Sequence, residues 1–158
     1  MATTSVITYN QILAVWKQIA ENHQQVKTFT IGDIFEVDAN TVVFPQIHLI
    51  TEQASISQHE LTYSFKLIAM DLVEPDESNE NEVLSDCLQY IQDFVAVWKN
   101  GVTSASPSFT IDSQDYRISE NVSCNPFTER FDTRVSGWVG DFSITVDFNA
   151  NACVVPIN

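Results

Sequence analysis

The strongest constraint on the fold is a two-residue alternation near the end of the chain. Successive side chains of a strand point to opposite faces, so alternation predicts a strand with one buried face. Residues 135–149 show it, with one mostly apolar face and one mostly polar face: Trp138, Phe142, Ile144, Val146 and Phe148 against Val139, Asp141, Ser143, Thr145 and Asp147. Residues 120–131 predict a second strand, and a turn at residues 132–134 closes a long C-terminal hairpin. The apolar face of this hairpin must pack against other elements of the fold.

A second alternation runs through residues 59–72. One face carries apolar side chains, namely Leu61, Tyr63, Phe65, Leu67 and Ala69. The pattern blurs at Ile68, Met70 and Leu72, which predicts burial on both sides at the far end of this strand. Residues 41–51 also read as a strand, but Pro45 cannot donate to a ladder, so an edge position or a bulge is expected there.

Two amphipathic helices supply the cover. Apolar residues recur at helical spacing over residues 9–24, with Thr8 or Asn10 as the cap. Residues 79–99 form the second helix, with Asn79 as cap and Glu82 three positions later in a variant capping box. Its apolar stripe predicts that Cys87 is a small core residue.

The order of elements predicts an α+β fold in which two helices pack on one face of a largely antiparallel sheet, with a long C-terminal β-hairpin. We expect one domain over residues 1–158. Its parts are a helix at 9–24, strands within 26–72, a helix at 79–99, a linker at 101–107 and strands within 108–149.

Charge and cysteines exclude several classes of function. The formal net charge is −14, and the seven Lys and Arg residues are scattered, which argues against binding nucleic acid or anionic lipid. Eight acids and no base lie between Asp71 and Asp93, as expected of a solvated helix face. No apolar stretch approaches the length that spans a bilayer. Three cysteines without CxxC spacing indicate a reducing compartment, so we expect a soluble protein made inside a cell.

The usual signatures of chemistry do not occur in this sequence. The three histidines lack metal-ligand spacing, and His23 lies on the apolar side of the first helix, which favours a structural role. There is no GxSxG elbow, and the four glycines form no phosphate-binding loop. The acids at 76–82 lack the ligand spacing and the turn glycine of a calcium loop. We therefore predict no catalytic, cofactor-binding or metal-binding residue, and no enzyme.

Gly137 and Gly140 flank Trp138 within a predicted strand. A bulge is the first explanation, and close approach of a neighbouring subunit is the second. A hairpin with a polar outward face can project and add to the sheet of a partner. We therefore place a subunit interface on this hairpin, at Phe127, Arg130, Phe131, Arg134, Trp138 and Asp141.

With these elements in order, the chain resembles small tailed-bacteriophage proteins of the tail terminator, tail completion and neck (head-tail connector) type. The resemblance covers most of the chain. It rests on the order of elements and on two stretches, DESNENEVLSDCLQYIQDFVAVWKNG and CNPFTERFDTRVSGWVGDFSITVDFNANACVVP. Neither stretch is a catalytic signature.

The resemblance implies a virion structural protein, made in the bacterial host cytoplasm, that forms a hexameric or dodecameric ring between head and tail. It implies contact with other neck or tail proteins. DNA would pass through the ring without sequence-specific binding, and an acidic lining would let it slide. Two alternatives stay open: a tail tube or other virion structural subunit, and a small acidic DNA mimic that inhibits a host enzyme.

Overall fold

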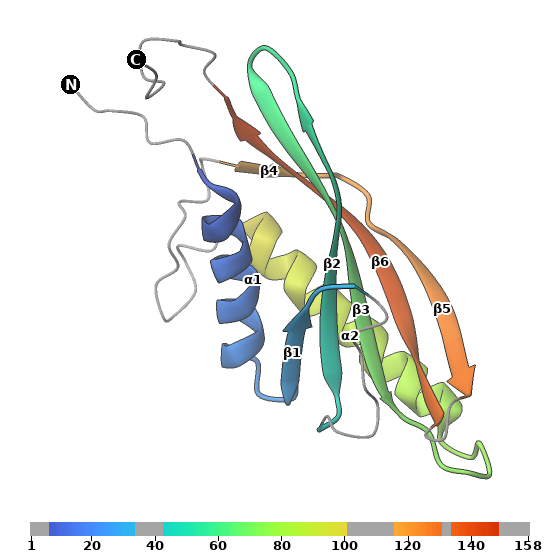
Figure 1. The fold of residues 1–158 in the computed structure, drawn as a ribbon. Helices are drawn as coiled ribbons and strands as arrows, with labels where there is room; N and C mark the ends of the chain where they lie inside the picture. The colour runs from blue at the N-terminus through green and yellow to red at the C-terminus, as the bar shows by residue number, and fades with distance from the viewer. Residues whose placement is uncertain (1–6, 34–42, 101–115, 131–133, 149–158) are drawn as a thin grey trace.

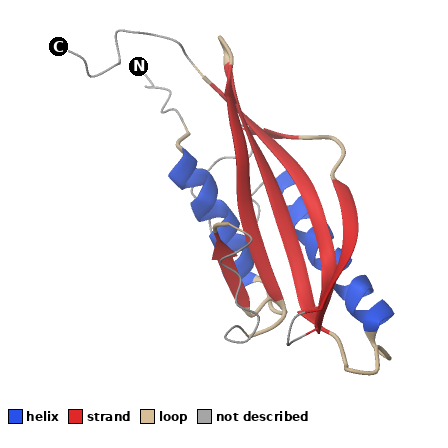
Figure 2. Ribbon diagram, turned by 45° about the vertical axis from the view of Figure 1, so that its right-hand side comes forward, coloured by secondary structure: helices blue, strands red, loops and turns tan. Residues whose placement is uncertain are grey.

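The computed structural model describes residues 7–33, 43–100, 116–130 and 134–148. Helix α1 (Tyr9–Asn22) is followed by the strands β1 (Thr28–Ile31), β2 (Gln46–Ile56) and β3 (Glu60–Leu72). Helix α2 (Glu80–Asn100) then leads to β4 (Tyr116–Ile118), β5 (Ser123–Arg130) and β6 (Arg134–Asp147). Both helices cover the same face of the sheet, so the predicted α+β fold is confirmed (Figures 1 and 2).

The sheet has the strand order β1, β2, β3, β6, β4, with β5 also paired to β6. All pairings are antiparallel except that of β1 with β2. Strand β6 pairs with β3 along its whole length on one side. On its other side it pairs with β5 up to Asp141 and with β4 at Ile144–Val146. The C-terminal hairpin is therefore built into the sheet and does not project from it, because β6 is an interior strand.

The core lies between the two helices and the sheet. Trp16 of α1 is fully buried, and its ring packs against Phe65 of β3, Phe142 of β6 and the aromatic rings of Phe94 and Trp98 in α2. The alternating residues of β3 and β6 that were predicted to face the core do so, with the exception of Phe148, which follows the end of β6 and is not part of the core. Cys87 is buried among them. Ile68 and Met70 are buried as well, on the opposite face of β3, which confirms burial on both sides at these positions. The prediction is wrong for Leu72, which is 44% exposed at the end of the strand.

The predicted N-terminal cap is confirmed for α1 and is wrong for α2. Thr8 caps α1, since its Oγ1 accepts a hydrogen bond from the Gln11 amide, and the Gln11 side chain accepts one from the Thr8 amide at 2.8 Å. The proposed side-chain cap of α2 is wrong. The Asn79 Oδ1 atom accepts instead from the backbone amide of Glu74 at 2.8 Å, which folds the preceding loop back on itself.

Two predictions about strand irregularities are also corrected. Pro45 precedes β2, and its carbonyl accepts hydrogen bonds from the amides of Lys27 and Thr28, so it lies in neither an edge strand nor a bulge. No bulge occurs at Gly137 or Gly140, because the register of β3 with β6 is continuous. A Cβ atom on Gly137 would lie 1.8 Å from the Ala69 carbonyl oxygen, so the close neighbour is the backbone of β3 in the same chain. The predicted linker at 101–107 lies outside the described residues.

Candidate subunit interface

The residues predicted to form a subunit contact do not lie together on one surface. Phe127 pairs with Gly137 and is half-buried; this register places it on the sheet face away from the helices. Asp141 is exposed on the same face, where its carboxylate lies 3.3 Å from the Lys66 ammonium group. Phe131 lies outside the described residues, as does the side chain of Arg130.

The other two predicted residues contact their own chain. The indole Nε1 of Trp138 donates to the Leu84 carbonyl of α2 at 2.7 Å, so this side chain points toward the helices. The Arg134 guanidinium lies 2.7 Å from the Glu77 carboxylate and donates to the Pro75 carbonyl, which fastens the loop before α2 to β6. Whether any of these residues contacts another subunit stays a prediction. Reversing the charge of Arg134 would break its internal ion pair with Glu77, so that substitution would not test a subunit contact.

The structure places His23, Cys87 and Cys124 as structural groups. The His23 ring packs against Tyr90 and Phe94, and its Nε2 lies 2.7 Å from the Asp93 carboxylate, which fastens the end of α1 to α2. Burial raises the pKa of the Cys87 thiol to about 12, so this group stays protonated at neutral pH. Burial also raises the pKa of the Cys124 thiol. Neither thiol is set up as a nucleophile.

A buried polar cluster lies where β1 meets β2. The Thr30 hydroxyl is 2.6 Å from the His48 Nδ1 and accepts a hydrogen bond from the Gln46 side-chain amide. The His48 Nε2 lies 3.1 Å from the Asp33 carbonyl. These contacts satisfy the side-chain nitrogen of Gln46 and both ring nitrogens of His48, which would otherwise be costly to bury, and they fix β1 against β2.

Other chemical sites were searched for in the same part of the chain. Within the described ranges, no group of three or more His, Cys, Asp or Glu side chains is arranged to hold a metal ion. Of the eight acids from Asp71 to Asp93, Asp71 lies near the end of β3 and the others lie on the β3–α2 loop and on α2. Several are exposed, as expected of a solvated surface. Neither of the two described helices combines the length and the apolar character needed to cross a membrane.

The feature that sequence reasoning missed is the second half of β2. Strand β1 pairs with β2 only at Gln46–Leu49, whereas β2 continues to Ile56. The side chains of residues 51–56 are all exposed, and Ile56 is 69% exposed. In Figures 1 and 2 the β2–β3 hairpin extends beyond the helices at this end of the sheet. The sequence offers one weak signal, an isolated Ile in a polar stretch.

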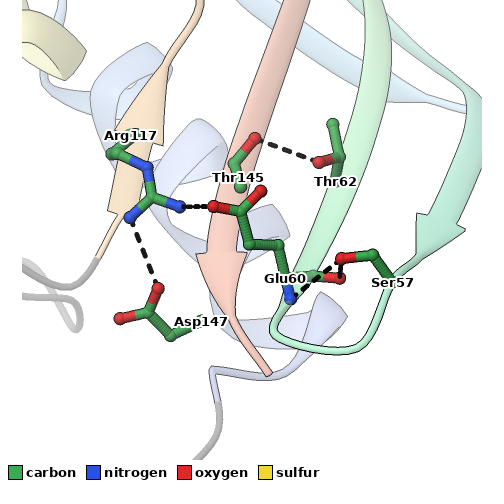
Figure 3. A network of polar contacts seen from close by, with 6 residues as sticks. All are labelled: Ser57, Glu60, Thr62, Arg117, Thr145 and Asp147. Carbon is green, nitrogen blue, oxygen red and sulfur yellow. Dashed lines mark hydrogen bonds and ion pairs between the residues drawn. The ribbon is translucent and has the colours of Figure 1, made fainter. Parts of the chain in front are cut away.

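Polar contacts hold the tip of the β2–β3 hairpin against the neighbouring strands (Figure 3). Arg117 of β4 donates to the Glu60 carboxylate at 2.6 Å and to the Asp147 carboxylate at 3.3 Å. The Ser57 hydroxyl accepts from the Glu60 amide, and the Thr62 and Thr145 hydroxyls are 3.1 Å apart. These contacts fix the tip of the hairpin to β4 and β6. The exposed half of β2 is therefore held in an extended conformation with its outer backbone edge in a fixed position.

Comparison with known proteins adds no assignment to this geometry. No protein-family model matches the chain, and no curated protein matches it in sequence.

Proposed function

We propose that this protein is a structural subunit of a tailed-bacteriophage particle. It associates with copies of itself into a closed ring in the neck or at the head-proximal end of the tail, around the path of the DNA. Its localisation is the virion, and its further partners are adjacent neck or tail proteins. The proposal assigns it no catalytic step.

The observation that carries the proposal is the exposed second half of β2. A strand edge presents unpaired backbone amides and carbonyls, which are a template for pairing with another chain. Ile56 adds an exposed apolar side chain at the end of the same strand. Association through one edge of the sheet and a different surface of the next copy is head-to-tail. Such contacts close into a ring when the rotation per subunit divides a full turn.

Charge supports a role around DNA without binding to it. The net charge of −14 repels phosphate, so a ring of these subunits would not hold DNA by counterion release. The resemblance in the order of elements, with its two quoted stretches, also supports the assignment.

A tail tube subunit is the second candidate, because the same strand edge would serve an open-ended cylinder. A DNA mimic is less well supported. Mimicry needs free carboxylates in rows at phosphate-like spacing, whereas the acids here crowd around the start of α2. Two of them are also engaged internally, Glu77 with Arg134 and Asp93 with His23.

Native mass spectrometry together with negative-stain imaging tests the proposal. Annular particles with one fixed stoichiometry are expected. Open cylinders would transfer the assignment to a tube subunit, and a monomer at every concentration would contradict both.

Two variants make the test specific. Ile56→Asp should abolish the rings, whereas Val43→Asp should leave them intact. The two side chains are 69% and 65% exposed. Ile56 is the last residue of β2 and Val43 lies three residues before its start, so the substitutions add the same charge and remove a similar exposed apolar side chain at two distant positions. Equal effects of the two variants would remove the second half of β2 from the contact.

A further inference from the structure

We infer that residues 153–157 of one copy add as an extra strand to the free edge of β2 at Gln53–Ile56 of a neighbouring copy. This inference specifies how the subunits of the proposed ring contact one another. It rests on the proposed function only in that the neighbouring copy is taken to be the adjacent subunit of the ring.

The acceptor edge follows from the pairing of β2. Among the described strands, only β1 lies on the outer side of β2, and their pairing ends where the Gly32 amide donates to the Leu49 carbonyl. A register shift at residues 51–53 marks a bulge, after which Gln53–Ile56 pairs regularly with β3. These four residues carry no charge. They form a short, regular and neutral edge.

The hydrogen-bond pattern shows which groups on this edge are free. The Ser57 amide donates to the Glu60 carbonyl at 2.8 Å, so these two residues face each other as a hydrogen-bonded pair. Such pairs alternate along an antiparallel ladder with pairs whose amides and carbonyls point outward. The next pair, Ile56 with Leu61, is therefore of the outward kind, as is Ala54 with Tyr63. Ala54 and Ile56 thus present outward amides and carbonyls that none of the described strands pairs with.

The opposite side of the sheet is less open to strand addition. Strand β5 contains Pro126, which lacks an amide hydrogen and is a residue that edge strands use against pairing. Strand β4 has three residues and is separated from β5 by residues 119–122. Strand β1 has four residues. The second half of β2 is thus the edge of this sheet best suited to a partner strand.

The donor is chosen by its chemistry and by where it leaves the sheet. Residues 149–158, NANACVVPIN, lie outside the described residues and contain no charged side chain, although the chain carries −14. Val154, Val155 and Ile157 are β-branched and favour strands. The Phe148 amide donates to the His59 carbonyl at 2.8 Å, so this segment departs beside the β2–β3 turn.

The proline in the donor is compatible with this pairing. Alternate residues of a strand bond to opposite sides. If Cys153, Val155 and Ile157 bond to the acceptor edge, the missing amide of Pro156 faces away and leaves no hydrogen bond unmade. The outer edge of the added strand then contains Pro156, whose missing amide hydrogen disfavours pairing with a further strand.

A length estimate favours the neighbouring copy over the same copy. From β6 to a strand added outside β2 is three strand spacings, or about 14 Å. From the Phe148 Cα atom to the Cys153 Cα atom there are five residue steps, which reach at most about 17 Å when fully extended. In the same chain this segment would also have to pass around the turn at residues 57–59 before it lies along the edge of β2, which leaves it almost no slack. An edge presented by a neighbouring copy does not impose this detour.

Complementation between two defective variants tests the inference. Deletion of residues 150–158 removes the donor and keeps the edge. Ala54→Pro removes an outward amide and keeps the donor, without breaking a bond to β3. Each variant alone should associate more weakly by on the order of tenfold or more, because at least one backbone hydrogen bond is lost per contact. An equal mixture should form pairs that contain one copy of each. Ala54→Ser, which keeps the amide, is the matched control and should associate normally.

Hydrogen exchange of the Ala54 and Ile56 amides gives an independent readout. Both should be protected in the full-length assembly and unprotected in the deletion variant, and a peptide of residues 149–158 should restore protection. Undiminished association of the deletion variant would overturn strand addition and leave the ring intact. Protection in a monomeric full-length chain, with no complementation, would place the segment on its own edge and also overturn the inference. Complementing pairs without annular particles would support strand addition and contradict the ring.

Discussion

Substitution of Gly137 by Ala should destabilise the fold severely, whereas the same change at Gly140 should not. Both glycines lie in β6, three residues apart. A Cβ atom at Gly137 would lie 1.8 Å from the Ala69 carbonyl oxygen, 2.8 Å from its carbonyl carbon and 2.9 Å from the Met70 Cα. All three atoms belong to the backbone of β3, so no side chain can turn aside to make room.

The size of the effect follows from the displacement required. A carbon and a carbonyl oxygen approach to about 3.3 Å at closest. Strands β3 and β6 would have to separate by about 1.5 Å, which breaks the ladder hydrogen bonds beside Gly137. Overpacking costs about 1 to 3 kcal/mol, and each lost backbone hydrogen bond adds about 1 kcal/mol. We expect a loss of about 3 to 5 kcal/mol in the free energy of unfolding, or about 10 °C in Tm.

Gly140→Ala is the matched control. Its Cβ would lie 3.4 Å from the Ile91 Cγ2 and 3.5 Å from the Cys124 Sγ and the Phe142 Cε2, which are ordinary contacts. Alanine there restricts the unfolded chain and should leave stability unchanged or raise it by about 0.5 kcal/mol. Urea unfolding followed by tryptophan fluorescence measures both variants. Equal stability of the two would refute the close approach of β6 to β3 at Gly137.

Two further predictions concern one carboxylate and one helix cap. Burial raises the pKa of Asp71 above its ordinary value of 3.8. The ionised carboxylate therefore lowers the free energy of unfolding at a pH above the folded-state pKa. This loss of stability disappears as the pH falls through that pKa and the group is protonated. Asp71→Asn should raise the urea midpoint at pH 7, and the gain should vanish below pH 3.8; a constant gain at both pH values would show that charge is not its cause. Thr8→Ala removes the hydroxyl that caps α1 and should cost about 1 kcal/mol, while Thr8→Ser should restore stability; no loss in the Ala variant would discount the cap.

Sequence reasoning worked best where a local period decides the structure. The alternation in β3 and β6 and the stripes of α1 and α2 predicted the elements, their order and the buried faces. It failed where the partner of a group is distant in the chain. Asn79 has the chemistry of a cap, but its oxygen was taken by the Glu74 amide. Gly137 was interpreted as a bulge because its actual neighbour, the Ala69 carbonyl, is 68 positions away in the sequence and was not foreseeable from local pattern.

The candidate interface also separates what local sequence pattern predicts from what depends on distant parts of the chain. The C-terminal hairpin was recognised correctly as a hairpin, but its role depended on which strands flank it. Strand β6 lies between β3 on one side and β4 with β5 on the other, so its backbone is already paired. The free edge belongs to β2, because β1 stops at Leu49 while β2 continues to Ile56.

The amino-acid sequence by itself determined the class of this protein: an acidic α+β chain whose alternating strands need helices on one face. Those properties come from charge and from periods of two and 3.6 residues, which act over neighbouring positions. Only the tertiary structure decided which strand edge remains open, which glycine meets a backbone and which arginine is held by an ion pair. These depend on the lengths of strands that pair across the sheet, and a strand does not carry in its own sequence the point at which its neighbour ends.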